Sequence, residues 1–247
     1  MVLPVGFDLL LGAAALVAGI VAAFTGFGIG SILTPLLALQ VDARLAVAAI
    51  SIPHFVGTAM RFLMLRGHVD RHVLWSFGLT SAAGGLTGAL LQVRVGNATL
   101  LVIFGSLLVF VAVSEFSGLA GRMRFRGLGA WLAGAASGLL GGLVGSQGSI
   151  RSAALLGLPL QREAFVATAT ATGLLVDAAR MPVYLWAQGG AVAALGPSLV
   201  IATVGVVAGT WLGGRLLPFI PHALFRRLVA ALVGALGIVM LWRALGM

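Results

Sequence analysis

This 247-residue chain has no cysteine, no lysine and little charge of either sign. Without cysteine, disulfide bonds, thiolate metal sites and cysteine nucleophiles are excluded. Charged residues make up only 9% of the chain and hydrophobic residues 60%, which is too little charge to cover a soluble domain. The apolar surface must therefore face lipid, and the composition predicts a multi-pass membrane protein.

The charge that is present is mostly positive. The formal net charge is +9, and all 15 basic residues are arginine. These arginines form short clusters between apolar runs, which is typical of cytoplasmic membrane loops beside anionic lipid. We therefore expect the lipid bilayer as a partner and no nucleic-acid binding, because no soluble basic surface exists to carry it.

Common catalytic motifs are missing as well. The chain has no Gly-x-Ser-x-Gly elbow, no HExxH pair and no phosphate loop with its lysine, and its four histidines are scattered. We predict that the protein is not an enzyme and has no metal site or cofactor. An intramembrane hydrolase built on Ser149 and His54 is an alternative that product formation in detergent would reveal.

The hydrophobic residues fall into eight blocks, where a membrane-spanning helix needs about 20 residues. The blocks cover approximately residues 3–40, 45–65, 73–91, 100–116, 131–157, 164–186, 191–212 and 224–242. The first and fifth contain glycine-rich runs, TGFGIGS at 25–31 and GGLVGSQGS at 141–149. Glycine lets the backbone leave helical geometry at low cost, so both blocks are predicted to be re-entrant hairpins broken at membrane depth.

The second half of the chain matches the first at an offset near 119 residues. The matched pairs are Gly19 and Gly138, Gly26 and Gly145, Arg61 and Arg180, and, at a slightly larger offset, Gly88 and Gly209, and Arg94 and Arg215. We predict two diverged repeats, residues 1–120 and 128–247, joined by a basic cytoplasmic linker at 121–127. The alternative is chance matching between two sequences rich in glycine and alanine.

The distribution of arginine predicts the topology. If both broken blocks are hairpins, one side of the membrane collects nine arginines, at positions 66, 71, 122, 124, 126, 162, 215, 226 and 227, and the other keeps Arg44, Arg94 and Arg243. The positive-inside rule then places both termini outside. The predicted fold is an all-α polytopic membrane protein with two inverted-topology repeats, each a re-entrant helical hairpin followed by three transmembrane helices.

Several short motifs occur in a characteristic order. They are GFGIGS at 26–31 with Pro35 after it, AVAA at 46–49, Arg61, GHVD at 67–70 and GTWLGGR at 209–215. This order resembles the TauE/SafE family of sulfite-exporter-like permeases over essentially the whole chain. The resemblance implies export of sulfite or small organosulfonates across the inner (plasma) membrane. The second half departs from the family pattern at GSQGS, 145–149, and near Ala154, where a proline is expected, so the exact anion stays open.

The chemistry of the breaks suits an anion. A helix that restarts after a glycine break presents free backbone N–H groups and a partial positive charge. The candidate substrate ligands at these helix starts are Gly28, Gly30, Ser31, Gln147, Gly148 and Ser149. The alternative is that the glycines serve only close helix packing.

Two arginines lie deep inside apolar blocks at matched positions. Arg61 and Arg180 are costly there, by about 2.5–3.5 kcal/mol on insertion scales, and their planar donor forks suit a sulfite or sulfonate group. The alternative for Arg180 is pairing with Asp177, three residues earlier on the same helix face. Arg151, just after the second break, is a further candidate whose role is open.

Asp177 and His54 are the titratable residues inside predicted spans, and they are the candidates for proton coupling. The alternatives are a salt-bridge role for Asp177 and a packing role for His54.

The predicted function is secondary transport that exports a small sulfur oxyanion by alternating access, with the anion held at mid-membrane by the hairpin helix N-termini and the arginines. The alternative from another class is a hairpin-gated passive channel for a small solute. The sequence leaves open the exact anion, the coupling ion, the transport direction and the oligomeric state, with a homodimer among the alternatives.

Overall fold

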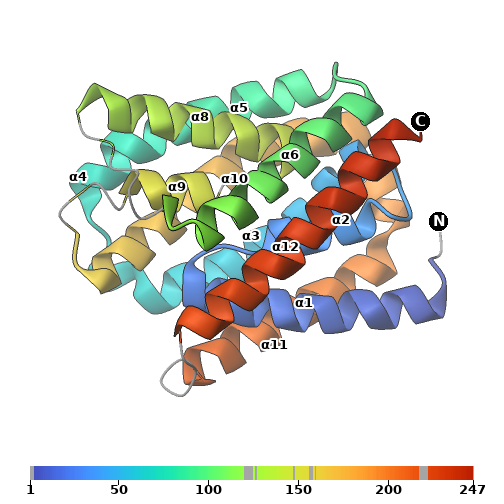
Figure 1. The fold of residues 1–247 in the computed structure, drawn as a ribbon, viewed down its shortest axis with the longest axis horizontal. Coiled ribbons are helices and arrows are strands. Elements are labelled where there is room, and N and C mark those ends of the chain that lie inside the picture. The colour runs from blue at the N-terminus through green and yellow to red at the C-terminus, as the bar shows by residue number, and fades with distance from the viewer. Residues whose placement is uncertain are drawn as a thin grey trace.

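The computed structural model describes residues 3–119, 125, 127–146, 148–155, 158, 160–216 and 222–246, and its regular elements there are all helical (Figure 1). The first half contains α1 (Val5–Thr25), α2 (Ile29–Leu37), α3 (Ala43–Leu65), the 3₁₀ turn η1 (Arg66–His68), α4 (Arg71–Val73), the π-helical turn η2 (Leu74–Gly78), α5 (Leu79–Gln92) and α6 (Asn97–Phe116). The second half contains α8 (Leu128–Val144), α9 (Gly148–Leu155), α10 (Arg162–Ala194), α11 (Gly196–Leu216) and α12 (His222–Leu245).

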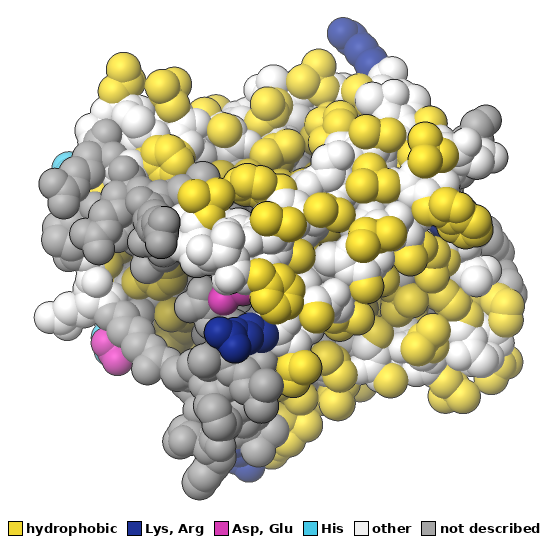
Figure 2. Space-filling view, in the orientation of Figure 1, with side chains coloured by type: hydrophobic (Ala, Val, Ile, Leu, Met, Phe, Trp, Pro, Cys, Tyr) yellow, Lys and Arg dark blue, Asp and Glu magenta, His cyan; other side chains and the backbone are white. Residues whose placement is uncertain are grey.

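Six segments of the described chain are long and apolar enough to cross a bilayer: Val5–Ala23, Ala43–His68, Arg71–Gln92, Asn97–Phe116, Gly196–Arg215 and Arg227–Leu245. Hydrophobic side chains are spread over the face seen in Figure 2, where charged side chains show at only a few positions. Large apolar residues such as Trp75, Leu132 and Trp186 are exposed at the surface of the molecule. The prediction of an all-helical, multi-pass membrane protein is confirmed.

One gap between predicted blocks coincides with a kink. The blocks 164–186 and 191–212 leave residues 187–190 between them. Helix α10 runs from Arg162 to Ala194 and joins two helical segments across a kink at Gln188, where φ is −140° and ψ is 16°. The backbone thus leaves helical geometry in the gap between the two apolar blocks, and α11 begins beyond it at Gly196.

Helices from the two halves pack against each other. Helix α1 packs on α11, α8 packs on α5, and α6 packs on α12, while α3 and α10 pack together and contact α11 and α5 respectively. Glycine allows the closest of these contacts, since a Cβ at Gly19 would overlap the carbonyl of Val206 and one at Gly138 would overlap that of Ser81. The pair α3 and α10 lies between the other helices and carries the buried polar residues described next.

Candidate functional site

Both glycine-rich runs interrupt a helix. Helix α1 ends at Gly26 with φ 79°, and α8 ends at Gly145 with φ 76°. These left-handed values favour glycine, and each glycine N–H caps its own helix by donating to Ala22 O at 2.9 Å or to Gly141 O at 3.0 Å. The chain then resumes as the short helices α2 and α9.

The two breaks are in direct contact. Ser31 Oγ and Ser146 Oγ lie 2.8 Å apart, and both side chains are buried. A Cβ at Gly30 would overlap the carbonyl oxygen of Gly145, and one at Gly148 would overlap the side chain of Phe27. Glycine runs that are far apart in the sequence therefore form one shared junction.

Arg61 extends from α3 to the end of α1 and is only 4% exposed. Its Nη1 donates to Ala22 O at 2.6 Å and its Nη2 to Gly26 O at 3.2 Å, while Nε donates to Thr170 Oγ1 on α10 at 3.0 Å. A guanidinium at a helix C-terminus is favoured by the helix dipole. Arg61 thus joins α1, α3 and α10, and no carboxylate among the described residues pairs with it.

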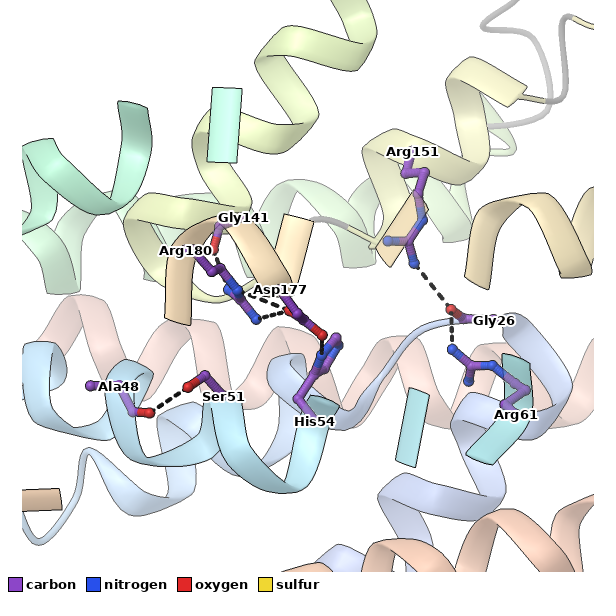
Figure 3. A network of polar contacts seen from close by, with 9 residues as sticks. All are labelled: Gly26, Ala48, Ser51, His54, Arg61, Gly141, Arg151, Asp177 and Arg180. Carbon is purple, nitrogen blue, oxygen red and sulfur yellow. Dashed lines mark hydrogen bonds and ion pairs between the residues drawn. The ribbon is translucent and has the colours of Figure 1, made fainter. Parts of the chain in front are cut away.

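A second cluster surrounds Asp177 on α10 (Figure 3). Asp177 Oδ2 lies 2.7 Å from Nδ1 of His54 on α3, and Oδ1 accepts from Arg180 Nε at 2.9 Å and lies 2.7 Å from Nη2. The third nitrogen of Arg180 donates to Gly141 O, at the end of α8. All three side chains are buried, so the charge of this arginine is neutralised within the protein.

Arg151 reaches the first break from α9. It is 2% exposed, and its Nη2 donates to Gly26 O at 3.2 Å. Figure 3 shows Arg151 and Arg61 approaching that same carbonyl from different helices. Among the described residues, Nε and Nη1 of Arg151 have no hydrogen-bond partner.

The buried charges do not balance. Arg61, Arg151 and Arg180 carry three positive charges, and in the described part of the chain only Asp177 pairs with one of them, Arg180. Burying an unpaired ion costs several kcal/mol even after relaxation. Charged residues at this depth rarely persist without a function, so the surplus positive charge makes these arginines candidates for binding an anion.

The family model for the sulfite exporter TauE/SafE matches residues 11–240. The chain belongs to this family. Comparisons with curated proteins and with solved structures gave no match.

Members of the TauE/SafE family are transporters of sulfite and related sulfur anions and not enzymes. The predictions of the family, of a membrane transporter and of a non-enzyme are therefore confirmed. The buried surplus of arginine at the junction suits the anionic substrate that the family implies.

The structure brings most of the predicted site residues of this TauE/SafE protein together. Gly28, Gly30 and Ser31 are buried in the first turn of α2 or just before it, and Gly148 begins α9. Gln147 and the side chain of Ser149 lie outside the described residues. The ion pair of Arg180 with Asp177 is the contact that the structural alternative for that arginine expects, whereas Arg61 has no acidic partner in the part of the chain that is described.

Three further residues of the site were not predicted from the sequence. Tyr184 donates from its hydroxyl to Gly142 O, and Gly173 lies beside both Arg151 and Thr58. A threonine or a glycine is common in membrane helices and does not by itself indicate a site. A position-by-position comparison of the two halves of the sequence is a signal that could have indicated them.

Proposed function

We propose that this protein is a secondary transporter that exports a small sulfur oxyanion, sulfite or an organosulfonate, across the inner membrane by alternating access. The observation that carries the proposal is the buried, unneutralised guanidinium of Arg61 at the junction of the two helix breaks. An oxyanion supplies the missing negative charge, and the fork of N–H donors fits its oxygens.

The short helices support re-entrant hairpins. Helix α2 has nine residues and α9 has eight, which correspond to about 12–14 Å at 1.5 Å per residue. The hydrocarbon core is about 30 Å thick, so neither helix can cross it. Each packs against the helix before it, and we propose that each returns to the side from which its hairpin entered.

Matched contacts support two repeats, residues 1–120 and 128–247. Arg61 donates to Ala22 O and Arg180 donates to Gly141 O, and both the arginines and the carbonyls are 119 residues apart. The linker 121–127 lies largely outside the described residues. The inverted topology places the two hairpins on opposite sides of the substrate, and rocking of one repeat against the other would expose the site alternately.

The distribution of arginine between the two sides of the molecule supports one orientation in the membrane. Figure 1 shows the N- and C-terminal ends at the same side of the molecule. The opposite side holds α4, the end of α11 and the start of α12, which carry Arg71, Arg215 and Arg227. The positive-inside rule therefore supports a cytoplasmic location for that side. An inside-negative potential then favours exit of an anion by about 2.3 kcal/mol per charge per 100 mV, which supports export.

The start of α2 is suited to help hold the anion. Gly28 occupies its N-cap position with no side-chain cap, so the first backbone N–H groups of the helix keep their donor capacity. The partial positive charge of the helix end adds to that of Arg61. We propose that Gly28, Gly30 and Ser31 contribute from the first hairpin, with Gln147, Gly148 and Ser149 contributing from the second.

The contact between His54 and Asp177 supports proton coupling. These groups belong to α3 and α10, the helices that join the two repeats, and lie 2.7 Å apart. Protonation of either one weakens or changes their bond, so a proton can bias the packing of the two helices. Arg180 holds Asp177 in place and fixes the end of α8.

Uptake into proteoliposomes tests the proposal. With the membrane potential clamped at zero and an imposed pH gradient, we expect sulfite to accumulate above its external concentration. Equilibration without accumulation would show the hairpin-gated channel instead. His54→Gln should keep sulfite exchange at equal pH but lose accumulation, and unchanged accumulation would contradict the coupling role.

Lysine substitutions test direct recognition by arginine. Arg61→Lys keeps the charge but removes the bidentate fork, so we expect sulfite affinity to fall about tenfold, which corresponds to about 1.4 kcal/mol. Arg180→Lys should affect affinity less, because Asp177 already occupies two of its nitrogens. Equal affinities in the wild type and Arg61→Lys would contradict the role of Arg61.

A further inference from the structure

The two repeats differ in charge at three matched positions around the buried arginines. At the offset that matches Arg61 to Arg180, the pairs are Thr58 and Asp177, Gly173 and His54, and Ile32 and Arg151. The cluster around Arg180 therefore contains a carboxylate, from Asp177, and the imidazole of His54. At the matched positions, the cluster around Arg61 contains the hydroxyl of Thr58, a glycine in place of the histidine, and the additional guanidinium of Arg151.

Gly173 has no side chain, which leaves room for the guanidinium of Arg151. A Cβ at Gly173 would lie 2.9 Å from Nη1 of Arg151 and 3.5 Å from Cγ2 of Thr58. Nε and Nη1 of Arg151 and the hydroxyl of Thr58 are buried and lack hydrogen-bond partners in the part of the chain that the structure describes. Buried polar groups are nearly always satisfied, so this concentration of free groups marks the place of a ligand.

The charge of this cluster gives the class of the ligand. Within the described ranges, the ion pairs of the structure join Asp177 to His54 and to Arg180, and they include neither Arg61 nor Arg151. Both donate instead to one neutral acceptor, Gly26 O, at 3.2 Å, which is a long hydrogen bond. Two guanidiniums that share a carbonyl oxygen can be neutralised together by a ligand with two negative charges.

We propose that Arg151, Thr58 and the space beside Gly173 form, together with Arg61, a subsite for a divalent oxyanion. The inference rests on the proposed function and sharpens it, because sulfite in its divalent form fits this charge and a monovalent organosulfonate leaves one guanidinium unpaired. Thr58 donates its hydroxyl to the anion. The Asp177 cluster, being neutralised, does not contact it.

Binding of two probes tests the charge class. Sulfite and methanesulfonate are titrated against the purified protein at alkaline pH, where sulfite is divalent. We expect the wild type to prefer sulfite, and Arg151→Gln to weaken sulfite binding about tenfold or more while methanesulfonate binding changes less. Arg151→Lys should restore part of the preference. The exposed Arg94→Gln is the control and should match the wild type.

A second variant probes the same subsite without changing charge. Gly173→Ala places a methyl group against Nη1 of Arg151, and alanine favours helix formation, so the variant should fold. We expect weaker sulfite binding. Gly189→Ala in the same helix is the matched control, since nothing lies within 4 Å of its added Cβ.

The outcomes separate this inference from the proposed function. If the wild type neither binds nor transports either anion, the proposed function is wrong and the subsite with it. If the wild type transports sulfite but Arg151→Gln and Gly173→Ala both keep its affinity and preference, the divalent subsite alone is wrong. Preference of the wild type for methanesulfonate would also overturn it.

Discussion

The two buried clusters differ in how their charge is balanced. Around Arg180 the protein supplies its own counter-ion, Asp177, which also binds His54. Around Arg61 it supplies a second arginine, and among the described residues no carboxylate pairs with either. One cluster is therefore neutralised within the protein, whereas the other is suited to the external anion proposed above.

Removing the counter-ion should break the neutralised cluster around Arg180, with the largest effect on stability. Asp177→Asn keeps the shape of the side chain but leaves the Arg180 charge buried and unpaired. Breaking a buried pair in this way costs about 3–5 kcal/mol, so we expect a marked fall in the midpoint of thermal unfolding in detergent. Arg180→Met added to Asp177→Asn should recover part of the loss.

The control for this prediction is Asp42→Asn, because Asp42 is exposed and its side chain makes no cap bond. We expect its unfolding midpoint to match that of the wild type. Similar unfolding midpoints of Asp177→Asn and Asp42→Asn would show that the ion pair between Asp177 and Arg180 does not stabilise the fold.

Adding a carboxylate to the cluster around Arg61 should make it resemble the neutralised cluster around Arg180 and weaken its binding of sulfite. Thr58→Asp places a carboxylate at the position matched to Asp177, beside Arg151 and Arg61. It would neutralise the arginines and repel an anion, so we expect sulfite binding to fall about 100-fold, or about 2.8 kcal/mol. Isothermal titration with sulfite measures the change.

Thr58→Asn is the neutral control of the same shape and should retain most of the affinity. The unfolding midpoint of Thr58→Asp should not fall as it does in Asp177→Asn, because the added charge finds two partners. Undiminished sulfite binding in Thr58→Asp would place the anion elsewhere.

Much of the fold could be predicted because a bilayer permits few structures. Backbone hydrogen bonds must be satisfied locally, so long apolar blocks become helices. The breaks occur within the two glycine runs, where α1 ends at Gly26 and α8 ends at Gly145. The gap between the predicted blocks 164–186 and 191–212 likewise coincides with an interruption, the kink at Gln188.

The site could be predicted only as far as its residue types are unusual in a membrane. Arg61, Arg180, Asp177 and His54 stand out because charge is costly at that depth. The division of roles could not be predicted, because it depends on which side chains of α3, α9 and α10 meet. The importance of Gly173 in particular lies in a contact with Arg151 that packing alone creates.

The junction that both clusters share should be sensitive to a single methyl group. Gly30→Ala places a Cβ against the carbonyl oxygen of Gly145, which is backbone and cannot rotate away. Overpacking of this kind costs about 1–3 kcal/mol, so we expect a lower unfolding midpoint and slower sulfite transport. Gly6→Ala is the control, since its Cβ would meet nothing within 4 Å. Equal transport by both variants would show that the breaks need no close approach.

The smallest expected effect concerns the hydrogen bond between Ser31 and Ser146, which joins α2 to the break that follows α8 at 2.8 Å. Each Ser→Ala variant should lose about 0.5–1.5 kcal/mol of stability, because the remaining hydroxyl is left buried. The double variant should lose less than the sum, since it removes both hydroxyls, and this coupling is measured by a double-mutant cycle on thermal unfolding. If the bond also breaks when the repeats rock, the double variant should change the rate of sulfite exchange while leaving its affinity unaltered. Strictly additive losses with an unchanged exchange rate would mean that the hairpins do not act through this contact, and the two clusters would then communicate only through α3 and α10.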